Sequence, residues 1–352
     1  MKIGILTHHY INNFGAFLQA YCLQQAISEL YPNDDVYIID CLNLKHFIIN
    51  TGGWFRFYNE KENLSCWISK INIPHTFSKV RKQHMNLTKR CYTAKDIEKL
   101  GLDYVVVGSD EVWNYKEDKG NTEVKFGIGL NKEKLVAYAP SVGKSTDLDV
   151  PKYVSDGIRK FKAVSARDVA TEKIAGKIRN EEVCRVVDPT FLYKIDGEPV
   201  KGIKKPYVLF YYCDGLAREE KKKIIAYAKQ NGMEVYGAGE CDKLYSDITA
   251  DLTPFQWVWM FKNASYVVTG TFHGAVFSML NHRKFACYLT NPSRIKKVSS
   301  LLNEFNLSDR QAAGNADEII KTMTKEIDYE SIEQIFNKRR AESKEYLKRA
   351  ID

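Results

Sequence analysis

Residues 2–30 read KIGILTHHYINNFGAFLQAYCLQQAISEL. The apolar run 2–7 predicts a buried strand, and the stretch 16–30 has the length and composition of a helix that begins near Gly15. Glycine and asparagine residues between the two fit a tight turn. A short buried strand that turns directly into a helix is the repeating unit of a doubly wound α/β fold.

The same alternation of strand and helix continues along the chain in two blocks. Strands are predicted at 36–40, 103–107, 135–139, 162–166 and 184–188, and then at 207–212, 234–237, 265–269 and 284–289. Helices are predicted at 168–179, 217–230, 254–263, 274–281 and 293–305. A charged stretch at 194–205 separates the blocks. This pattern predicts two Rossmann-like doubly wound α/β domains that face a cleft.

The predicted boundaries follow from these blocks. Residues 1–195 form the N-terminal domain, 203–328 the C-terminal domain and 329–352 a closing helix. Residues 41–100 are aromatic and less regular, with GGWFRFY followed by a basic helical run, and we interpret them as an insertion that flanks or covers a site.

Composition narrows the class of protein. The 352 residues include 52 Lys and Arg against 44 Asp and Glu, a net charge of +8, and 44% are hydrophobic, which is typical of a globular chain. The mild positive charge suits an anionic small substrate or loose contact with acidic lipid headgroups at the inner face of a membrane. Basic residues are not clustered with aromatics as in a nucleic-acid-binding protein.

Cysteine usage and the first residues predict the compartment. The eight cysteines are scattered and contain no CxxC pair, so neither a metal site nor a disulfide framework is expected. The N-terminus becomes polar too soon for a secretory signal, and no apolar run reaches the length of a membrane span. We therefore expect a cytoplasmic protein with reduced thiols.

Ligands of doubly wound sheets bind beyond the carboxyl ends of the strands, so polar residues at these positions are candidates for a site. In the first block these are Asn13, Gly15, Ser109, Asp110, Ser141, Arg167 and Asp168. Helix capping, turn formation or a surface salt bridge is the competing interpretation of each. His8 and His9 also follow the first strand, and at least one of them is expected to face solvent.

The sharpest local feature is VVTGTFHGAVFSML at 267–280. It places His273 at the start of a helix, directly after a strand and between two glycines, with Thr271 and Gly274 beside it. A histidine in this setting can donate a hydrogen bond to an anion or move a proton. Arg294 and Lys297 begin another helix downstream and are candidate partners for a phosphate or carboxylate.

In this order, NNFGAFLQAYCLQ, DYVVVGSDEVWN, VAYAPSVG, SARD, VVDPTFL, TGTFHGAVFS and SRIKKVSSLLNEFNLSDR resemble the polysaccharide pyruvyl transferase family. The resemblance extends from about residue 1 to about residue 310, with 41–100 poorly matched. It implies a fold like that of two-domain GT-B glycosyltransferases. His273 matches the motif histidine of the family and Arg167 the basic position of its SxR[DE] element. Some members carry an arginine two residues before the histidine, where this chain has Thr271.

The resemblance also implies a reaction. A pyruvyl group is transferred from phosphoenolpyruvate, a co-substrate, to two hydroxyls of a sugar, glycan or lipid-linked precursor, which forms a cyclic ketal. His273, Asp110 and Asp168 are candidates for the proton transfers, and Arg167 is expected near the phosphoenolpyruvate, on the opposite side of one anion from His273. No cofactor or metal is required.

Two other classes stay open. A GT-B glycosyltransferase that uses a nucleotide sugar would share the fold, but the paired glutamates expected near the nucleotide have only Glu318 and Glu326 as late counterparts. A sugar-binding protein without enzymatic activity could also have two α/β lobes, but it would need an export signal.

Overall fold

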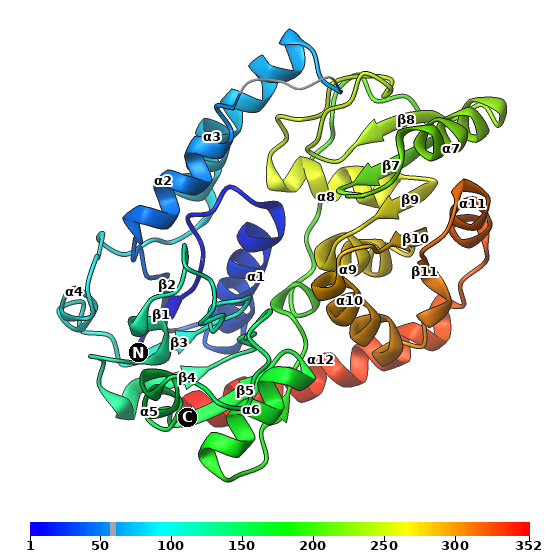
Figure 1. Ribbon diagram of the computed structural model, residues 1–352. Coiled ribbons are helices and arrows are strands. Elements are labelled where there is room, and N and C mark those ends of the chain that lie inside the picture. Colours follow the sequence, from blue (N-terminus) through cyan, green and yellow to red (C-terminus); the bar gives the residue numbers. More distant parts are fainter. Residues whose placement is uncertain (57–60) are drawn as a thin grey trace. The chain divides into compact units, whose positions relative to one another are not determined.

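The computed structural model describes residues 1–56 and 61–352 and places the predicted strands in two separate parallel sheets. The chain divides into two units, of which unit 1 contains 1–53, 78–194 and 336–352, and unit 2 contains 54–77 and 195–335. The prediction of two parallel α/β blocks is confirmed, and Figure 1 shows the elements of both units.

Unit 1 is built on a six-stranded sheet in the order β2-β1-β3-β4-β5-β6. Its strands are β1 (Lys2–Leu6), β2 (Asp35–Ile38), β3 (Tyr104–Val107), β4 (Leu135–Ala137), β5 (Ala163–Ala166) and β6 (Cys184–Arg185). Ile3 pairs with Val36 on one side and with Tyr104 on the other, all in parallel register. The central strands are short and almost wholly buried, as expected of parallel strands covered on both faces.

The helices of unit 1 are α1 (Phe14–Leu30), α2 (Leu44–Gly53), α4 (Ala94–Glu98), α5 (Lys152–Ile158) and α6 (Val169–Arg179), with 3₁₀ turns η1 (Glu123–Phe126), η2 (Lys132–Lys134) and η3 (Pro189–Phe191). The core beneath them includes Trp113, whose ring is stacked on Phe126 and whose Nε1 donates to the Lys125 carbonyl at 2.9 Å. This bond fixes the backbone of η1 at Lys125.

Unit 2 contains a five-stranded sheet in the order β11-β10-β9-β7-β8. Its strands are β7 (Tyr207–Tyr211), β8 (Glu234–Gly237), β9 (Tyr266–Thr269), β10 (Lys284–Tyr288) and β11 (Gln311–Ala312). Its helices are α7 (Arg218–Gln230), α8 (Pro254–Asn263), α9 (Phe272–Leu280), α10 (Pro292–Glu304) and α11 (Ala316–Thr324), with the 3₁₀ turn η4 (Ser308–Arg310). β11, α5 and α11 were not among the predicted elements.

Two long helices cross the division between the units. α3 (Leu64–His84) belongs to unit 2 up to Phe77, and α12 (Tyr329–Ile351) belongs to unit 1 from Phe336 onward. The unit 1 part of α12 packs on the sheet of that unit, because the Tyr346 hydroxyl donates to the Ala137 carbonyl at 2.9 Å. Residues 54–77, predicted as part of the first domain, therefore group with unit 2 instead.

The stretch 41–100 is more regular than predicted, although residues 57–60 lie outside the described part. It contains α2, α3 and α4, and α4 is closed by a capping box between Thr93 and Asp96. α3 spans 21 residues even though Pro74 lies inside it. The sequence did not reveal α2 and the first turns of α3, because their exposed faces carry apolar residues rather than a regular polar pattern. The basic run that ends α3 was predicted to be helical, and this prediction is confirmed.

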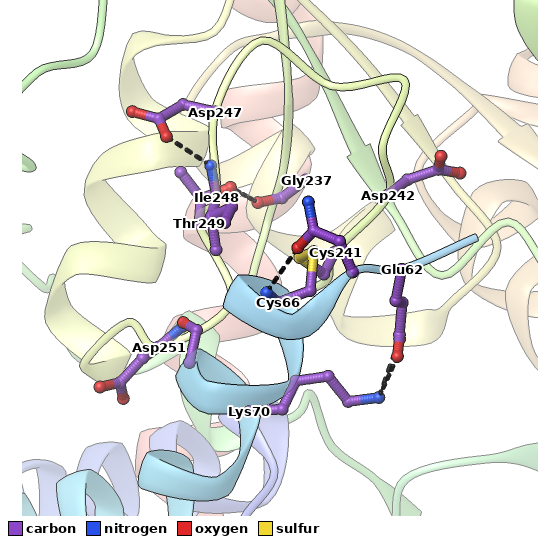
Figure 2. Close-up of a disulfide and its surroundings, with 12 residues drawn as sticks. Glu62, Cys66, Lys70, Gly237, Cys241, Asp242, Asp247, Ile248, Thr249 and Asp251 are labelled. Atoms are coloured by element: carbon purple, nitrogen blue, oxygen red, sulfur yellow. Dashed lines mark hydrogen bonds and ion pairs between the residues drawn. A yellow bond between two sulfur atoms is a disulfide. The ribbon is translucent and has the colours of Figure 1, made fainter. Parts of the chain in front are cut away.

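A disulfide joins Cys66 of α3 to Cys241, with their Cα atoms 5.9 Å apart (Figure 2). The expectation that all thiols are reduced is therefore wrong for this pair. The two cysteines are separated by 175 positions in the sequence, so no local spacing could predict the bond. Together with the hydrogen bond from Asp251 N to Ser69 Oγ, at 3.2 Å, the disulfide attaches the start of α3 to the loop after β8.

Candidate functional site

All paired strands of each sheet run parallel, so their carboxyl ends lie along one edge. The candidate residues fall at these two edges, one in each unit.

At the edge of unit 1, Arg167 is held between two carboxylates. Its Nη1 donates to Asp188 Oδ2 at 2.8 Å and its Nη2 to Asp110 Oδ1 at 3.3 Å. The guanidinium is buried, with 6% of the side chain exposed, and the Asp188 side chain is wholly buried. Burial alone would lower the pKa of Arg167, but Asp110 and Asp188 outweigh it and raise that pKa above its usual range.

The structure thus brings Asp110 and Arg167 together, as neighbours in one ion-pair group rather than as separate ligand contacts. The sequence left two interpretations of Arg167, a contact with a ligand anion or a surface salt bridge. The observed partners are the carboxylates of Asp110 and Asp188, and both salt bridges are buried. Asp110 is 21% exposed at its side chain and adopts a φ of 74°, in the left-handed region. Arg167 therefore orients the Asp110 carboxylate at this edge.

The two candidate serines of unit 1 make bonds to neighbouring backbone. The buried Ser109 hydroxyl donates to the Ala139 carbonyl at 2.9 Å, and the peptide bond between Gly108 and Ser109 is cis. Ser141 Oγ accepts from the Gly143 N–H at 3.1 Å. These bonds stabilise the turns after β3 and β4, so both serines have a structural role at this edge.

Two further candidates act as helix caps. The Asn13 side chain accepts from the Ala16 N–H at the start of α1, and the buried Gly15 lies in the first turn of that helix. Asp168 Oδ1 accepts from both the N–H and the hydroxyl of Thr171, each at 2.9 Å, at the start of α6. For Asp168 the capping interpretation describes the observed contacts.

A buried basic group that the sequence did not reveal lies at the same edge. Lys125 Nζ donates to the Gly120 carbonyl at 3.0 Å and lies 2.9 Å from His8 Nδ1. Lys125 is 3% exposed, and burial lowers its pKa to about 7. His46 completes the group, since its ring centroid lies 5.4 Å from that of His8, and burial followed by the charge of Lys125 lowers the pKa of His46 to about 4.

The prediction that His8 or His9 faces solvent is wrong, because both are buried. Desolvation, with a contribution from Lys125, holds the pKa of His8 well below its usual range. His9 Nε2 lies 3.1 Å from Asp40 Oδ1, and Arg90 contacts the other oxygen of that carboxylate. Burial would raise the pKa of Asp40, but the contacts with His9 and Arg90 outweigh burial and lower it.

Beside this pair, two donors are buried without an acceptor among the described residues. Arg81 Nη2 donates to Asn12 Oδ1 at 3.2 Å, whereas Arg81 Nη1 and Asn12 Nδ2 have no hydrogen-bond partner there. Burial lowers the pKa of Arg81 to about 10. Only the two adjacent histidines in HHYINN signalled this part of the edge in the sequence, since Lys125 and Arg81 come from distant segments.

In unit 2, the turn after β9 is tightly packed. A Cβ atom on Gly270 would lie 2.3 Å from the Tyr212 carbonyl oxygen, and one on Gly274 would lie 2.0 Å from Thr269 Oγ1. Thr271 caps α9, with its side chain accepting from the Gly274 N–H at 3.0 Å. His273 is the second residue of α9 and is partly exposed. This places the His273 imidazole at a helix N-terminus, where the helix dipole favours negative charge.

Arg294 reaches the same turn from α10. Its Nη1 lies 2.7 Å from Asp214 Oδ2 and 3.5 Å from the Gly270 carbonyl oxygen, and both side chains of the ion pair are partly exposed. Lys297 lies three residues further along α10, on the same side of the helix. The structure therefore brings together Thr271, His273, Gly274 and Arg294.

Across residues 1–56 and 61–352, no group of three His, Cys, Asp or Glu side chains could hold a metal ion. No helix within the same ranges is both long enough and apolar enough to cross a bilayer.

Comparison with known proteins supports one family. A family model described as polysaccharide pyruvyl transferase matches residues 13–292. Among curated proteins, none matches the chain.

Solved structures with a similar fold are glycosyltransferases of the GT-B type. UGT71G1 from Medicago truncatula, solved with UDP-glucose, has a TM-score of 0.52 at 10% identity, over 100% of this chain and 98% of that one. SnogD from Streptomyces nogalater gives 0.45 at 11% identity over 99% and 97%, and the E. coli ADP-heptose heptosyltransferase II gives 0.41 at 10% over 96% and 99%. At these identities the likeness concerns the fold alone.

Proposed function

The chain belongs to the polysaccharide pyruvyl transferase family, and we propose that it transfers the pyruvyl group of phosphoenolpyruvate to two hydroxyls of one sugar. Membership implies a sugar or glycan acceptor. The observation that carries the proposal is the family match over residues 13–292, which includes Asp110, Arg167 and His273. The geometry of unit 2 supports it, because a dianionic donor needs cationic groups and a helix N-terminus.

We assign the donor to the turn of unit 2. Phosphoenolpyruvate carries a phosphate and a carboxylate. Arg294 contacts the turn that precedes α9, and Lys297 lies one turn further along α10. The pair of Arg294 with Asp214 is partly exposed, so its net stabilisation is small and a ligand phosphate can replace the carboxylate of Asp214. Thr271, in place of the arginine of other members, caps the helix rather than binding the anion.

The chemistry requires three proton movements. Protonation of the methylene carbon makes the adjacent carbon electrophilic, and a sugar hydroxyl attacks it as its proton passes to a base. The bond to the phosphate oxygen breaks, the second hydroxyl closes the ketal, and inorganic phosphate leaves with the remaining proton. We assign His273 to one proton transfer and Asp110, oriented by Arg167, to another. Asp168, the third candidate, is occupied as a cap of α6.

The competing nucleotide-sugar reaction has weaker support in the residues, although the fold accommodates it. Glu326 pairs with Lys284 at the amino end of β10, whereas His273 follows the carboxyl end of β9. Glu318 accepts from the Ala313 N–H near the start of α11. Glu326 therefore lies away from the carboxyl edge of the sheet, and Glu318, near the end of β11, is engaged by the backbone of the turn before α11.

A binding experiment with the two donors distinguishes pyruvyl transfer from glycosyl transfer. Phosphoenolpyruvate and UDP-glucose are titrated separately into the full chain, with thermal unfolding as the readout. A ligand at 100 times its dissociation constant stabilises the folded state by about 2.7 kcal/mol. We expect stabilisation by phosphoenolpyruvate, and loss of most of it in Arg294→Ala but not in Arg218→Ala, which removes a partly exposed arginine of α7. Stabilisation by UDP-glucose alone would contradict the proposal and favour the glycosyltransferase.

The role of His273 in proton transfer is tested by measuring the turnover of a variant. His273→Asn keeps a polar side chain at the start of α9, so the fold and donor binding should persist while phosphate release falls about a hundredfold or more. Unchanged turnover, or unfolding of the variant, would show that the histidine is structural.

A further inference from the structure

Two hydrogen-bond donors beside the loop that follows β1 are buried and have no acceptor within residues 1–56 and 61–352. They are Arg81 Nη1 and Asn12 Nδ2. Arg81 is 8% exposed and Asn12 2%, so bulk solvent does not satisfy these groups. Because Arg81 Nη2 donates to Asn12 Oδ1 at 3.2 Å, the two free N–H groups lie close to each other. Buried donors without an acceptor cost stability, so a pair of them points to a ligand or an ordered water between them.

The charges around these two donors favour an anion. Asp40 is the carboxylate whose charge acts on Arg81, but its two oxygens are already engaged, one by His9 Nε2 at 3.1 Å and the other by Arg90 Nε at 2.9 Å. Burial lowers the pKa of His9, so its ring is neutral near pH 7. Two guanidinium groups beside one carboxylate therefore leave a net positive charge. Asn12 also directly precedes the N-cap of α1, and the N-terminus of a helix favours negative charge.

A ligand can reach these donors because α2 is weakly anchored over them. The Asn12 N–H donates to Asn50 Oδ1 of α2 at 2.8 Å, and the Tyr10 hydroxyl lies 3.3 Å from His46 Nδ1 of the same helix. None of the ten residues of α2 is buried. A helix without buried residues gains little from packing, so it can open locally at a low cost in free energy.

We propose that Arg81 and Asn12 bind an oxyanion, a phosphate or a carboxylate, in the loop between β1 and α1. Arg81 Nη1 and Asn12 Nδ2 can donate to two oxygens of one such group, which is the arrangement that favours bidentate binding. The groups that build this site, Asp40 and α2 included, all belong to unit 1. It differs from the Arg167 group, where two carboxylates already occupy the guanidinium.

The source of the anion rests on the proposed function. Since phosphoenolpyruvate is assigned to unit 2, the anion in unit 1 would belong to the acceptor, as it would in a sugar phosphate or a sugar acid. The binding site itself does not depend on the reaction. A failure of pyruvyl transfer would leave anion binding in unit 1 intact, and the absence of anion binding there would leave the titration with phosphoenolpyruvate intact.

Titration calorimetry of the full chain with inorganic phosphate, and separately with acetate, tests the proposal. Arg294→Ala serves as the background, because it removes the arginine assigned to phosphoenolpyruvate in unit 2. In this background Asn12→Asp replaces the free donor by a carboxylate oxygen of the same size, which pairs with Arg81. Arg90→Gln is the matched control, because it removes a guanidinium from the same carboxylate, that of Asp40, and leaves both free donors in place.

We expect the background protein to bind at least one of the two anions. Asn12→Asp should weaken this binding about tenfold or more, whereas Arg90→Gln should bind about as tightly as the background. Without any anion, Asn12→Asp should also raise the midpoint of thermal unfolding, because it supplies an acceptor to the buried Arg81. Absence of binding by both anions, or binding that Asn12→Asp leaves unchanged, would overturn the proposal and assign the space between the donors to a buried water.

Discussion

The buried amine of Lys125 makes the stability of the protein depend on pH in a defined direction. Burial lowers the pKa of Lys125 from 10.5 to about 7 in the folded protein, and the charges of Cys41 and Asp110 oppose this shift only in part. The unfolded chain recovers the ordinary value. Above pH 7, therefore, the unfolded state binds more protons than the folded state, and the free energy of unfolding rises with pH.

The magnitude follows from the two pKa values. The cost of burying the charged amine is present in full below pH 7 and disappears as the pH approaches the pKa of the unfolded chain. Between pH 7 and pH 9 the free energy of unfolding should rise by about 2 kcal/mol from this one group. The stabilising direction is upward in pH because the folded-state pKa of a base is lowered.

Lys125→Met removes the charge and keeps most of the stem. Urea unfolding at several pH values between 7 and 9 should show that the unchanged protein gains about 2 kcal/mol relative to this variant. Lys144→Met, at an exposed lysine of the same unit, should keep the original profile. Parallel profiles for the protein and Lys125→Met would refute the buried charge, and Lys125→Gln serves the same comparison if the methionine variant does not fold.

Three further substitutions test the edges. Gly270→Ala should lower the free energy of unfolding by about 1–3 kcal/mol, measured in urea, because the new methyl group meets the Tyr212 carbonyl; an unchanged value would mean that the turn can widen. Asp188→Asn should cost about 3 kcal/mol, since it takes one of two carboxylates from the buried Arg167, and a neutral result in thermal unfolding would contradict the ion-pair group. Asp168→Ala should cost about 1 kcal/mol and leave phosphate release per folded molecule unchanged. A large fall in release at unchanged stability would instead return Asp168 to the reacting groups.

The alternation of strand and helix was predictable because it depends on local periodicity. Each strand of four or more residues lies within or beside a predicted range, and α1 and α9 begin at their glycine-containing turns. β11 was missed because two residues carry no periodicity, and its pairing with β10 comes from tertiary structure. α2 and the first turns of α3 were missed because their apolar residues do not all face a core, whereas the basic run that ends α3 was predicted to be helical.

Only part of the candidate site could be predicted from the sequence. Residues that follow a strand directly, such as Asp110 and His273, could be found from the sequence because chain order places them at the edge. Lys125 and Arg81 could not, since each reaches the edge of unit 1 from an element outside the strand ends. Their importance depends on burial, which only the folded structure supplies.

The distribution of charge at the two edges favours unit 2 for the donor. At the edge of unit 1, Arg167 lies between two carboxylates, so this ion-pair group carries a net negative charge that repels phosphate or carboxylate. In unit 2, Arg294 has one carboxylate beside it, that of the exposed Asp214, and the N-terminus of α9 adds a favourable dipole. A neutral sugar is not repelled by Asp110, and a carboxylate beside its hydroxyls can accept a proton. Under the proposed function, the charges of these two groups favour unit 2 for the anionic co-substrate and unit 1 for the hydroxyl-bearing acceptor.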